Sequence, residues 1–287
     1  MPELERLPVG QIVKVGGAAI TEKQRFETLN SEVLRETAKH LKVVYDKNQR
    51  EGLGLIVVHG AGSFGHFQAS QSGVSKGGID REDVRTGFVN TRLSVTKLNH
   101  HVVTAMVQEG IPAVGVSVCG HWTTAARQIN SGPVDEIAGL LRAGLVPILH
   151  GDAVLDIALG CTILSGDVIV RHLAAHFRPN FVLFLTNVEG IYDQPPANEG
   201  AELIKEITVN SDGTWLAGTG ATKISFEISD HDTTGGIETK IKEAVDIACM
   251  GLDVLIAKAG TQCGLEACEN GPLVEKHWVG THVKFNS

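Results

Sequence analysis

The sequence predicts an α/β protein in which helices cover both faces of a central, mainly parallel β-sheet, a three-layer αβα sandwich. Two patterns indicate this class. Short apolar, β-branched runs alternate along the chain with longer segments of helical periodicity, and glycine-rich turns repeatedly follow the apolar runs. The 287 residues, 43% of them hydrophobic, are also enough to build a sizeable core.

Strands are assigned to runs rich in valine, isoleucine, leucine and phenylalanine, and helices to segments whose apolar residues recur every three or four positions. In chain order, we expect a strand over 11–16, a helix over 31–50 N-capped by Ser31, a strand over 55–58, a helical region over 81–109 with a possible break near Gly87, a strand over 111–116, a helix over 134–142, a strand over 145–149, a small hairpin over 154–162, a helix over 168–176, a strand over 181–185, a helix over 237–250, a strand over 252–258 and a last strand over 278–283. Residues 207–230 are polar and receive no assignment.

No composition shift or linker marks a clean domain boundary. Residues near 177 could divide two lobes of one continuous sheet, so we consider residues 1–176 and 177–287 as two halves of one domain. The glycine-rich segment 73–80 is predicted to be flexible, as a lid or substrate loop.

The overall charge and the cysteines exclude several classes of protein. A net charge of −8 argues against general affinity for nucleic acid or anionic membranes. Five scattered cysteines without a CxxC pair indicate reduced thiols rather than a disulfide framework or a zinc site. No apolar run approaches the length of a membrane span, and the first ten residues hold no apolar signal region. We therefore expect a cytoplasmic protein.

The stretch 57–67, Val-Val-His-Gly-Ala-Gly-Ser-Phe-Gly-His-Phe, organises the chain. A buried strand enters a loop with three glycines, which is closed by His66. Glycine lets backbone N–H groups approach an anion closely, and such loops feed ligand sites at the carboxyl edge of a parallel sheet. The alternative is a tight strand-to-helix turn with structural histidines. The stretch is neither a P-loop nor a dinucleotide fingerprint, so by itself it indicates an anion site.

Three more segments place glycine beside a charged or hydroxyl residue near a strand end or helix start. They are 14–18 (Lys-Val-Gly-Gly-Ala), 165–167 (Ser-Gly-Asp) and 233–240 (Thr-Thr-Gly-Gly-Ile-Glu-Thr-Lys). Helix N-termini and glycine-rich turns favour phosphate oxygens. Lys14 and Lys240 are far apart in sequence, yet both lie at such turns, and a lysine is a compact charge suited to a moving phosphoryl group.

Together these segments resemble the amino acid kinase superfamily and, within it, the isopentenyl phosphate kinase family, in its plant-like form. The most discriminating piece is 59–66, and the stretch 184–192 is similar to the family's nucleotide-site strand and turn. The resemblance covers nearly the whole chain. It implies the amino acid kinase fold and transfer of a phosphoryl group from ATP to isopentenyl phosphate, with Mg²⁺ on the ATP phosphates and few direct protein ligands. It also implies a homodimer.

The resemblance assigns residues to an acceptor-binding half, 1–176, and a nucleotide-binding half, 177–287. Lys14, His66, Asp167 and Lys240 take the catalytic roles, with His66 on the acceptor phosphate. Acceptor binding is assigned to Ala61, Gly62, His66 and Gly166, and an apolar tail pocket to Phe88, Ile148 and Ile163. Nucleotide binding is assigned to Lys14, Gly16, Gly17, Ala18, Lys23, Gly62, Asp167, Thr186, Asn187, Gly190, Tyr192, Gly235, Gly236 and Lys240. Dimethylallyl phosphate is a further possible acceptor.

Each residue also has a structural interpretation. Lys14 could be an edge-strand lysine and Lys23 a solvated surface charge. Asp167 could cap the helix after Gly166, and His66 could be a turn histidine. His59 and His150 end strands and are interpreted as structural, and the cysteines as core residues.

Three positions depart from the family pattern: Asn187 stands where aspartate is common, Ile237 where methionine is frequent, and Ala61 where many relatives carry glycine.

Two other functions stay open. One is a kinase of the same fold for a phosphonate, a nucleotide monophosphate or an amino acid carboxylate. The other is a nucleotide sensor without turnover.

Overall fold

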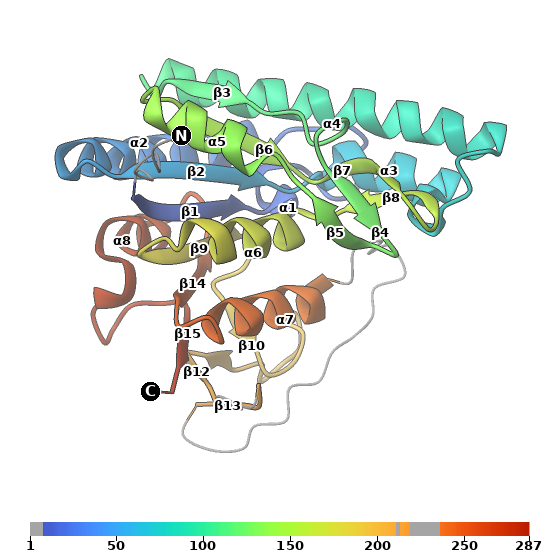
Figure 1. Ribbon diagram of the computed structural model, residues 1–287. Coiled ribbons are helices and arrows are strands. Elements are labelled where there is room, and N and C mark those ends of the chain that lie inside the picture. Colours follow the sequence, from blue (N-terminus) through green and yellow to red (C-terminus); the bar gives the residue numbers. More distant parts are fainter. Residues whose placement is uncertain (1–7, 211–212, 219–235, 287) are drawn as a thin grey trace.

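The computed structural model describes residues 8–210, 213–218 and 236–286. A β-sheet runs through the middle of the molecule, with helices on either side (Figure 1). Within those residues the sheet has nine strands, in the spatial order β13 (Trp215–Ala217), β12 (Glu206–Val209), β15 (Thr281–Phe285), β14 (Asp253–Lys258), β9 (Phe181–Thr186), β1 (Val9–Val15), β2 (Gly54–His59), β6 (Val146–His150) and β3 (Ala113–Gly115). Of the eight pairings that join these nine strands, only β14–β15 and β12–β13 are antiparallel, which confirms the predicted mainly parallel sheet.

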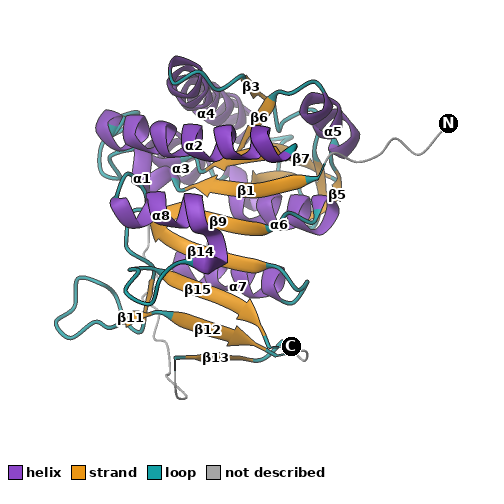
Figure 2. Ribbon diagram, turned by 90° about the vertical axis from the view of Figure 1, so that its left-hand side faces the viewer, coloured by secondary structure: helices purple, strands orange, loops and turns teal. Residues whose placement is uncertain are grey.

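Successive residues of the central strands point to opposite faces and so enter two different cores. Ile12 and Phe184 lie in the core shared with α5 (Val134–Arg142), α6 (Gly166–Phe177) and α7 (Gly236–Ala248). Their neighbours Val13 and Leu183 lie in the opposite core, with α2 (Ser31–Glu51), α4 (Glu82–Gln108) and α8 (Gln262–Asn270). Figure 2 shows α2 and α8 in front of the sheet and α6 and α7 behind it. The three layers are as predicted.

Two local predictions about helices are wrong. Asn30, rather than Ser31, caps α2, because its side chain accepts a hydrogen bond from the Val33 N–H at 3.3 Å. Helix α4 is also unbroken at Gly87. A Cβ atom there would lie 2.0 Å from the Ser72 Cβ, so this glycine lets α3 (Gly62–Ser72) pack closely on α4.

Several short elements were not anticipated by the sequence. The predicted hairpin is present as β7 (Asp152–Asp156) and β8 (Gly160–Leu164), but it belongs to a second, four-stranded sheet in the order β5-β4-β7-β8. Besides α3, β12 and β13, the other elements without a predicted counterpart are β4 (Thr123–Ala125), β5 (Gln128–Ser131), the pair β10 (Ile191–Tyr192) and β11 (Leu203–Ile204), α1 (Gly17–Ile20), α8 and the 3₁₀ turns η1 (Val74–Lys76) and η2 (Gly271–Leu273). The last strand begins at Thr281 rather than near Trp278, whose indole N–H donates to the Cys263 carbonyl at 2.8 Å.

The main sheet is continuous across residue 177. Strand β9, which follows that position, pairs in parallel with β1, from Gln11↔Phe181 to Val15↔Leu185. The two predicted halves therefore share one sheet. Among the described residues, none of the helices combines the length and the apolar character that crossing a lipid bilayer requires.

Candidate active site

The turns that follow β1 and β2 touch each other backbone to backbone. A Cβ atom on Gly17 would lie 2.2 Å from the Gly62 nitrogen, and one on Gly60 would lie 2.6 Å from the Gly17 nitrogen. Gly62 also has a φ of +50°, in the left-handed region that favours glycine. These three glycines are therefore required by the close approach of two turns at the carboxyl edge of the sheet.

The hydroxyl of Thr21 joins the same two turns. It donates to the Gly17 carbonyl at 2.8 Å and accepts from the Ser63 N–H at 3.0 Å. Ser63 lies in the first turn of α3, where backbone N–H groups have no acceptor within the helix. The Thr21 hydroxyl therefore satisfies one of these donors. Within the described residues, no hydrogen-bond partner is found for the Ala61 and Gly62 N–H groups.

The loop predicted over 59–66 is wrong in its second part, because α3 begins at Gly62. His66 is therefore a half-buried residue of a helix, one turn from its start, rather than the end of a loop. In the sequence, these glycines indicate a loop. The side chain that accepts from the first turn of this helix, Thr21, comes from another part of the chain, so no local pattern marks the helix start. His66 and the Ala61–Gly62 amides lie at the same end of α3.

Lys14 and Asp167 form an ion pair beside these turns. Lys14 Nζ lies 2.5 Å from Asp167 Oδ2, and the two side chains are 7% and 13% exposed. Ser165, not Asp167, is the side-chain cap of α6, since its hydroxyl accepts from the Val168 N–H. Breaking a buried pair by removing one partner leaves an uncompensated charge, so each residue holds the other in place.

Gly166, the first residue of α6, lies at the same carboxyl edge of the sheet. A Cβ atom on Gly166 would lie 3.3 Å from the His59 carbonyl oxygen and 3.5 Å from Lys14 Cε. The N-terminus of α6 thus meets the ends of β1 and β2, where the N-terminus of α3 also begins. Both helix starts carry partial positive charge, which favours a phosphate between them.

His59 and His150 form a stacked, buried pair under these turns, with ring centroids 5.4 Å apart. Burial, reinforced by His150, lowers the pKa of His59 to about 3, and burial lowers the pKa of His150 to about 4. Each Nδ1–H donates to the carbonyl of the following glycine, at 3.0 Å for His59 and 3.2 Å for His150. Asn99 of α4 donates to His59 Nε2 at 3.1 Å. Both rings are therefore neutral and hold the glycine turns, in agreement with the structural interpretation.

A buried carboxylate that the sequence analysis missed lies next to this pair. Asp152 is fully buried, its Oδ2 lies 3.7 Å from His150 Nδ1, and Arg92 of α4 forms an ion pair with it. Burial raises the pKa of Asp152 to about 7, although the Arg92 guanidinium opposes the rise. The sequence gave no sign that Arg92, a charged residue inside α4, pairs with Asp152, because the two residues are 60 positions apart.

The three residues predicted for the tail pocket separate into two places. Phe88 and Ile163, both partly buried, pack on a small apolar cluster formed by Val74, Val84, Ala153 and Cys161. Ile148 is fully buried in the core beneath the sheet, with α2 and α4, and the structure does not bring it to the other two.

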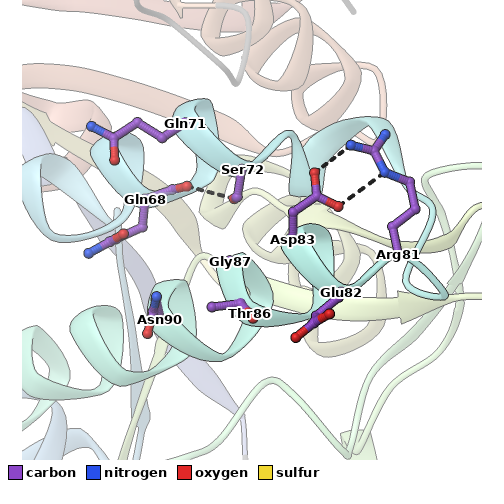
Figure 3. Close-up of a pocket in the computed structure, with 9 residues that line it drawn as sticks. All are labelled: Gln68, Gln71, Ser72, Arg81, Glu82, Asp83, Thr86, Gly87 and Asn90. Carbon is purple, nitrogen blue, oxygen red and sulfur yellow. Dashed lines mark hydrogen bonds and ion pairs between the residues drawn. The ribbon is translucent and has the colours of Figure 1, made fainter.

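A hollow of about 820 Å³ lies between α3 and the start of α4 (Figure 3). Its lining is polar and comprises Gln68, Gln71, Ser72, Arg81, Glu82, Asp83, Thr86, Gly87 and Asn90. Arg81 and Asp83 pair with each other across its rim. The hollow contains none of the predicted site residues.

The predicted nucleotide residues gather after β9. Thr186 is buried at the end of that strand, and Asn187 follows it, exposed. Tyr192 donates to Glu189 Oε2 at 2.9 Å, and Lys258 Nζ lies 3.1 Å from Glu189 Oε1. The sequence analysis missed Glu189 and Lys258, because in a sequence a glutamate in a turn and a lysine at a strand end cannot be told from ordinary surface charges.

The strand register places Lys258 on the same face as Lys14. Lys14 aligns with Phe184 and, one strand further, with Ile256, while Lys258 aligns with Thr186. Side chains two residues apart share a face, so Lys14, Thr186 and Lys258 all point toward the α6–α7 side. The carboxyl edge therefore carries a second lysine on this face.

The other predicted residues lie nearby or beyond what can be described. Gly16 donates its N–H to the Leu185 carbonyl at 2.7 Å, which ties the first turn to β9, and Ala18 is exposed on α1. Lys23 is exposed in the turn after α1. Gly236 and Lys240 belong to the first turns of α7, and Gly235 lies outside the described residues. A Cβ atom on Gly190 would lie 2.4 Å from Thr281 Oγ1, so this glycine serves packing against β15.

Comparison with known proteins identifies the family of this chain. The model of the amino acid kinase family matches residues 11–258. The chain is 45% identical to isopentenyl phosphate kinase of Arabidopsis thaliana, over 96% of this chain and 95% of that protein. It is 32% identical to isopentenyl phosphate kinase of Methanothermobacter thermautotrophicus, over 89% and 93%. A crystal structure of isopentenyl phosphate kinase superposes with a TM-score of 0.76 at 28% identity, over 96% of this chain and 99% of that one. The chain belongs to the amino acid kinase family and, within it, to the isopentenyl phosphate kinases.

Proposed function

We propose that this protein transfers the γ-phosphoryl group of ATP to isopentenyl phosphate and so forms isopentenyl diphosphate. The observation that carries the proposal is the buried Lys14–Asp167 pair, set where two glycine turns and the starts of α3 and α6 meet. A cation in that place can stabilise charge on a phosphoryl group between two anions. The relationship to the isopentenyl phosphate kinases supports the choice of acceptor.

The acceptor needs little chemical activation. Its phosphate has a second pKa near ~6 and is largely dianionic at neutral pH, so no strong base is required. The N–H groups of Ala61 and Gly62, His66 and the backbone at Gly166 are proposed to hold this phosphate, and Phe88 and Ile163 to contact its tail. Catalysis then consists of aligning two anions and neutralising their repulsion.

The donor is proposed to lie over the ends of β1, β9 and β14. Lys14, kept in place by Asp167, stabilises the transferred group, and the 16–18 turn, Lys23, Gly235, Gly236 and Lys240 contact the phosphates. Thr186, Asn187, Gly190 and Tyr192 are proposed to contact the nucleoside. Lys258 lies on the same face as Lys14 and adds positive charge at this end.

Mg²⁺ is proposed to enter with ATP, and it would neutralise charge on the ATP phosphates. The carboxylate nearest the transfer site, Asp167, is already engaged by Lys14. Among the described residues, no group of three or more His, Cys, Asp or Glu side chains could hold a metal ion.

The test is ADP release with ATP and Mg²⁺ over a panel of acceptors. The panel contains isopentenyl phosphate, dimethylallyl phosphate, a nucleoside monophosphate, a phosphonate and acetylglutamate, and phosphorus NMR identifies the product. We expect a diphosphate product from isopentenyl phosphate and, through a similar tail, from dimethylallyl phosphate. Turnover only with another acceptor would replace the proposed substrate, and nucleotide binding without any turnover would make the protein a sensor.

We also propose a homodimer formed through α4. Val89 and Leu93 are 59% and 72% exposed and, four residues apart, share one face of this helix. Sedimentation of the wild type and of Leu93→Glu tests this, with the variant expected to be a monomer. A cytoplasmic location is proposed as well, supported by the free thiols of Cys119, Cys161, Cys263 and Cys268.

A further inference from the structure

The carboxylate of Asp156, at the end of β7, organises two turns at once. The residue is 3% exposed. Its two oxygens accept five hydrogen bonds: Oδ1 from the N–H groups of Ala126 (3.1 Å), Ala158 (2.9 Å) and Leu159 (2.8 Å), and Oδ2 from Thr124 Oγ1 (2.7 Å) and the Arg127 N–H (2.8 Å). Burial opposes the charge, but these bonds outweigh it and hold the pKa of Asp156 well below its usual range. This is a built anionic centre that the reaction itself does not use.

The turn between β4 and β5 depends on this carboxylate. Ala126 and Arg127 have φ angles of +50° and +68°, in the left-handed region that residues with a side chain rarely adopt. Both donate their N–H groups to Asp156. The carboxylate therefore compensates a backbone conformation that these two residues would not adopt on their own.

The β4–β5 turn and the β7–β8 turn also bind the segment 74–79. The Leu159 carbonyl, in the β7–β8 turn, accepts from the Gly78 N–H at 2.8 Å, and a Cβ atom on Gly77 would lie 2.5 Å from that carbonyl oxygen. The Arg127 guanidinium donates to the Ser75 carbonyl at 3.1 Å. The segment expected from sequence as a flexible lid is thus connected, through Leu159 and Arg127, to one buried carboxylate.

The segment 74–79 forms one wall of the cluster that contains the proposed tail residues. Val74 and Ile79 pack there with Phe88 and Ile163, and Cys161 Sγ contacts the Val74 carbonyl at 3.7 Å. A Cβ atom on Gly160 would lie 2.9 Å from Ile79 Cγ2, so the β7–β8 turn and this wall are already in contact. Leu159 and Arg127, which bond this wall, both donate their backbone N–H groups to Asp156.

We propose that Asp156 is a positioning residue that fixes the size of the hydrocarbon site of the acceptor and so limits the length of the alkyl chain. The inference rests on the proposed function, since it takes Phe88 and Ile163 as contacts of the tail. Discrimination by length needs a rigid wall, because each added CH₂ by itself gains affinity in an apolar site. Asp156 supplies the rigidity without contacting the substrate.

The test is Asp156→Asn, which keeps the shape of the side chain but replaces one accepting oxygen by an NH₂ group that cannot accept from an N–H donor. We expect kcat/KM for a ten-carbon prenyl monophosphate, relative to isopentenyl phosphate, to rise roughly fivefold or more. The KM for ATP should stay unchanged. Thr124→Val, which removes one of the five bonds, should shift the ratio in the same direction by less. Asp135→Asn, an exposed aspartate on α5, is the matched control and should leave the ratio unchanged.

Hydrogen exchange provides a second measurement that is independent of turnover. The Gly78 amide, bonded to Leu159, should exchange faster in Asp156→Asn than in the wild type. An unchanged acceptor ratio, or equal losses for both acceptors together with a lower Tm, would overturn the inference and leave Asp156 a stabilising residue only. If the wild type does not phosphorylate isopentenyl phosphate, the proposed function fails and the inference with it. An active wild type with an unchanged ratio in the variant overturns the inference alone.

Discussion

At the scale of single residues, Lys14 is a charge placed in the interior of a buried strand. If it stabilises charge that develops during transfer, Lys14→Ala should lower kcat far more than it raises the KM for isopentenyl phosphate, by on the order of a hundredfold. Steady-state kinetics on the folded variant measures this. Because the substitution removes one charge of the pair with Asp167, Lys14→Met/Asp167→Asn, which removes both charges, is the control; it should regain stability but not kcat. A variant with wild-type kcat would refute the assigned role.

His66 is expected to serve the acceptor alone. A hydrogen bond to a charged group contributes roughly 1.5–3 kcal/mol, so His66→Ala should lower kcat/KM for isopentenyl phosphate about ten- to a hundredfold. His66→Gln keeps a donor at similar reach and should retain more activity. Calorimetric titration should find the affinity for ATP nearly unchanged in both variants. Parallel loss of both ligands and of Tm would instead make His66 a scaffold residue of α3.

The buried histidine pair predicts a pH dependence of stability. His150 is neutral in the folded protein, with its pKa lowered to about 4, whereas in the unfolded chain it binds a proton below the ordinary histidine pKa of 6.5. The unfolded state therefore takes up the extra proton, and this contribution to stability is lost as the pH falls from 6.5 to about 4. His150→Asn keeps a donor for the Gly151 carbonyl and should reduce the slope by up to roughly 1.4 kcal/mol per pH unit.

Urea unfolding of the wild type and of His150→Asn at several pH values measures the difference in slope. The comparison matters because Asp152, whose pKa is raised to about 7, acts in the opposite sense: in the folded protein it takes up a proton at a higher pH than in the unfolded chain, so its contribution to stability is lost as the pH rises toward 7. His59, with a pKa lowered to about 3, adds to the effect of His150. Parallel curves for the two proteins would show that His150 is not the neutral group described.

At the scale of elements, the contact between the β1 and β2 turns predicts a sharp contrast between two glycines. Gly17→Ala places a Cβ atom 2.2 Å from the Gly62 nitrogen, so the two turns must move apart. We expect a loss of roughly 2 kcal/mol or more of stability and a large loss of activity. Gly139→Ala in α5, where the nearest atom to the new Cβ lies at 3.9 Å, is the control. It should be neutral or stabilising by up to about 1 kcal/mol.

Thermal unfolding and the ADP-release assay on both variants decide this prediction. Equal effects of the two substitutions would show that the turns can separate without cost.

At the scale of the whole molecule, one central sheet runs through both halves, and we expect them to unfold as one cooperative unit. Removing residues 177–287 takes away β9, and with it the parallel partner of β1 and the Phe184 ring that lies 5.8 Å from Lys14 Nζ. The fragment 1–176 would then expose a buried strand edge. We expect it to lack a cooperative urea transition and a near-ultraviolet circular dichroism signal, while the full chain unfolds in a single step. Independent folding of the fragment would show that the halves are separate domains.

The sequence alone determined the alternation of strands and helices, the mainly parallel sheet, and the glycine-rich turns at its carboxyl edge. These features follow from local periodicity and from residues whose backbone preferences are strong, such as the glycines of 14–18 and 59–66. The helix over 134–142 was predicted with its observed bounds, because its apolar residues recur at helical spacing. The resemblance carried by the same glycine-rich segments also gave the family, which the comparisons confirm.

Only the tertiary structure decided which partners these residues meet. The first turn of α3 is bonded to the hydroxyl of Thr21, and the glycine inside the unbroken α4 lies against Ser72 of α3. The resemblance assigned Ile148 to the tail pocket, but its side chain is fully buried in the core. The five bonds to Asp156 come from residues up to 32 positions away. Such contacts are set by packing between distant segments, and no local pattern records them.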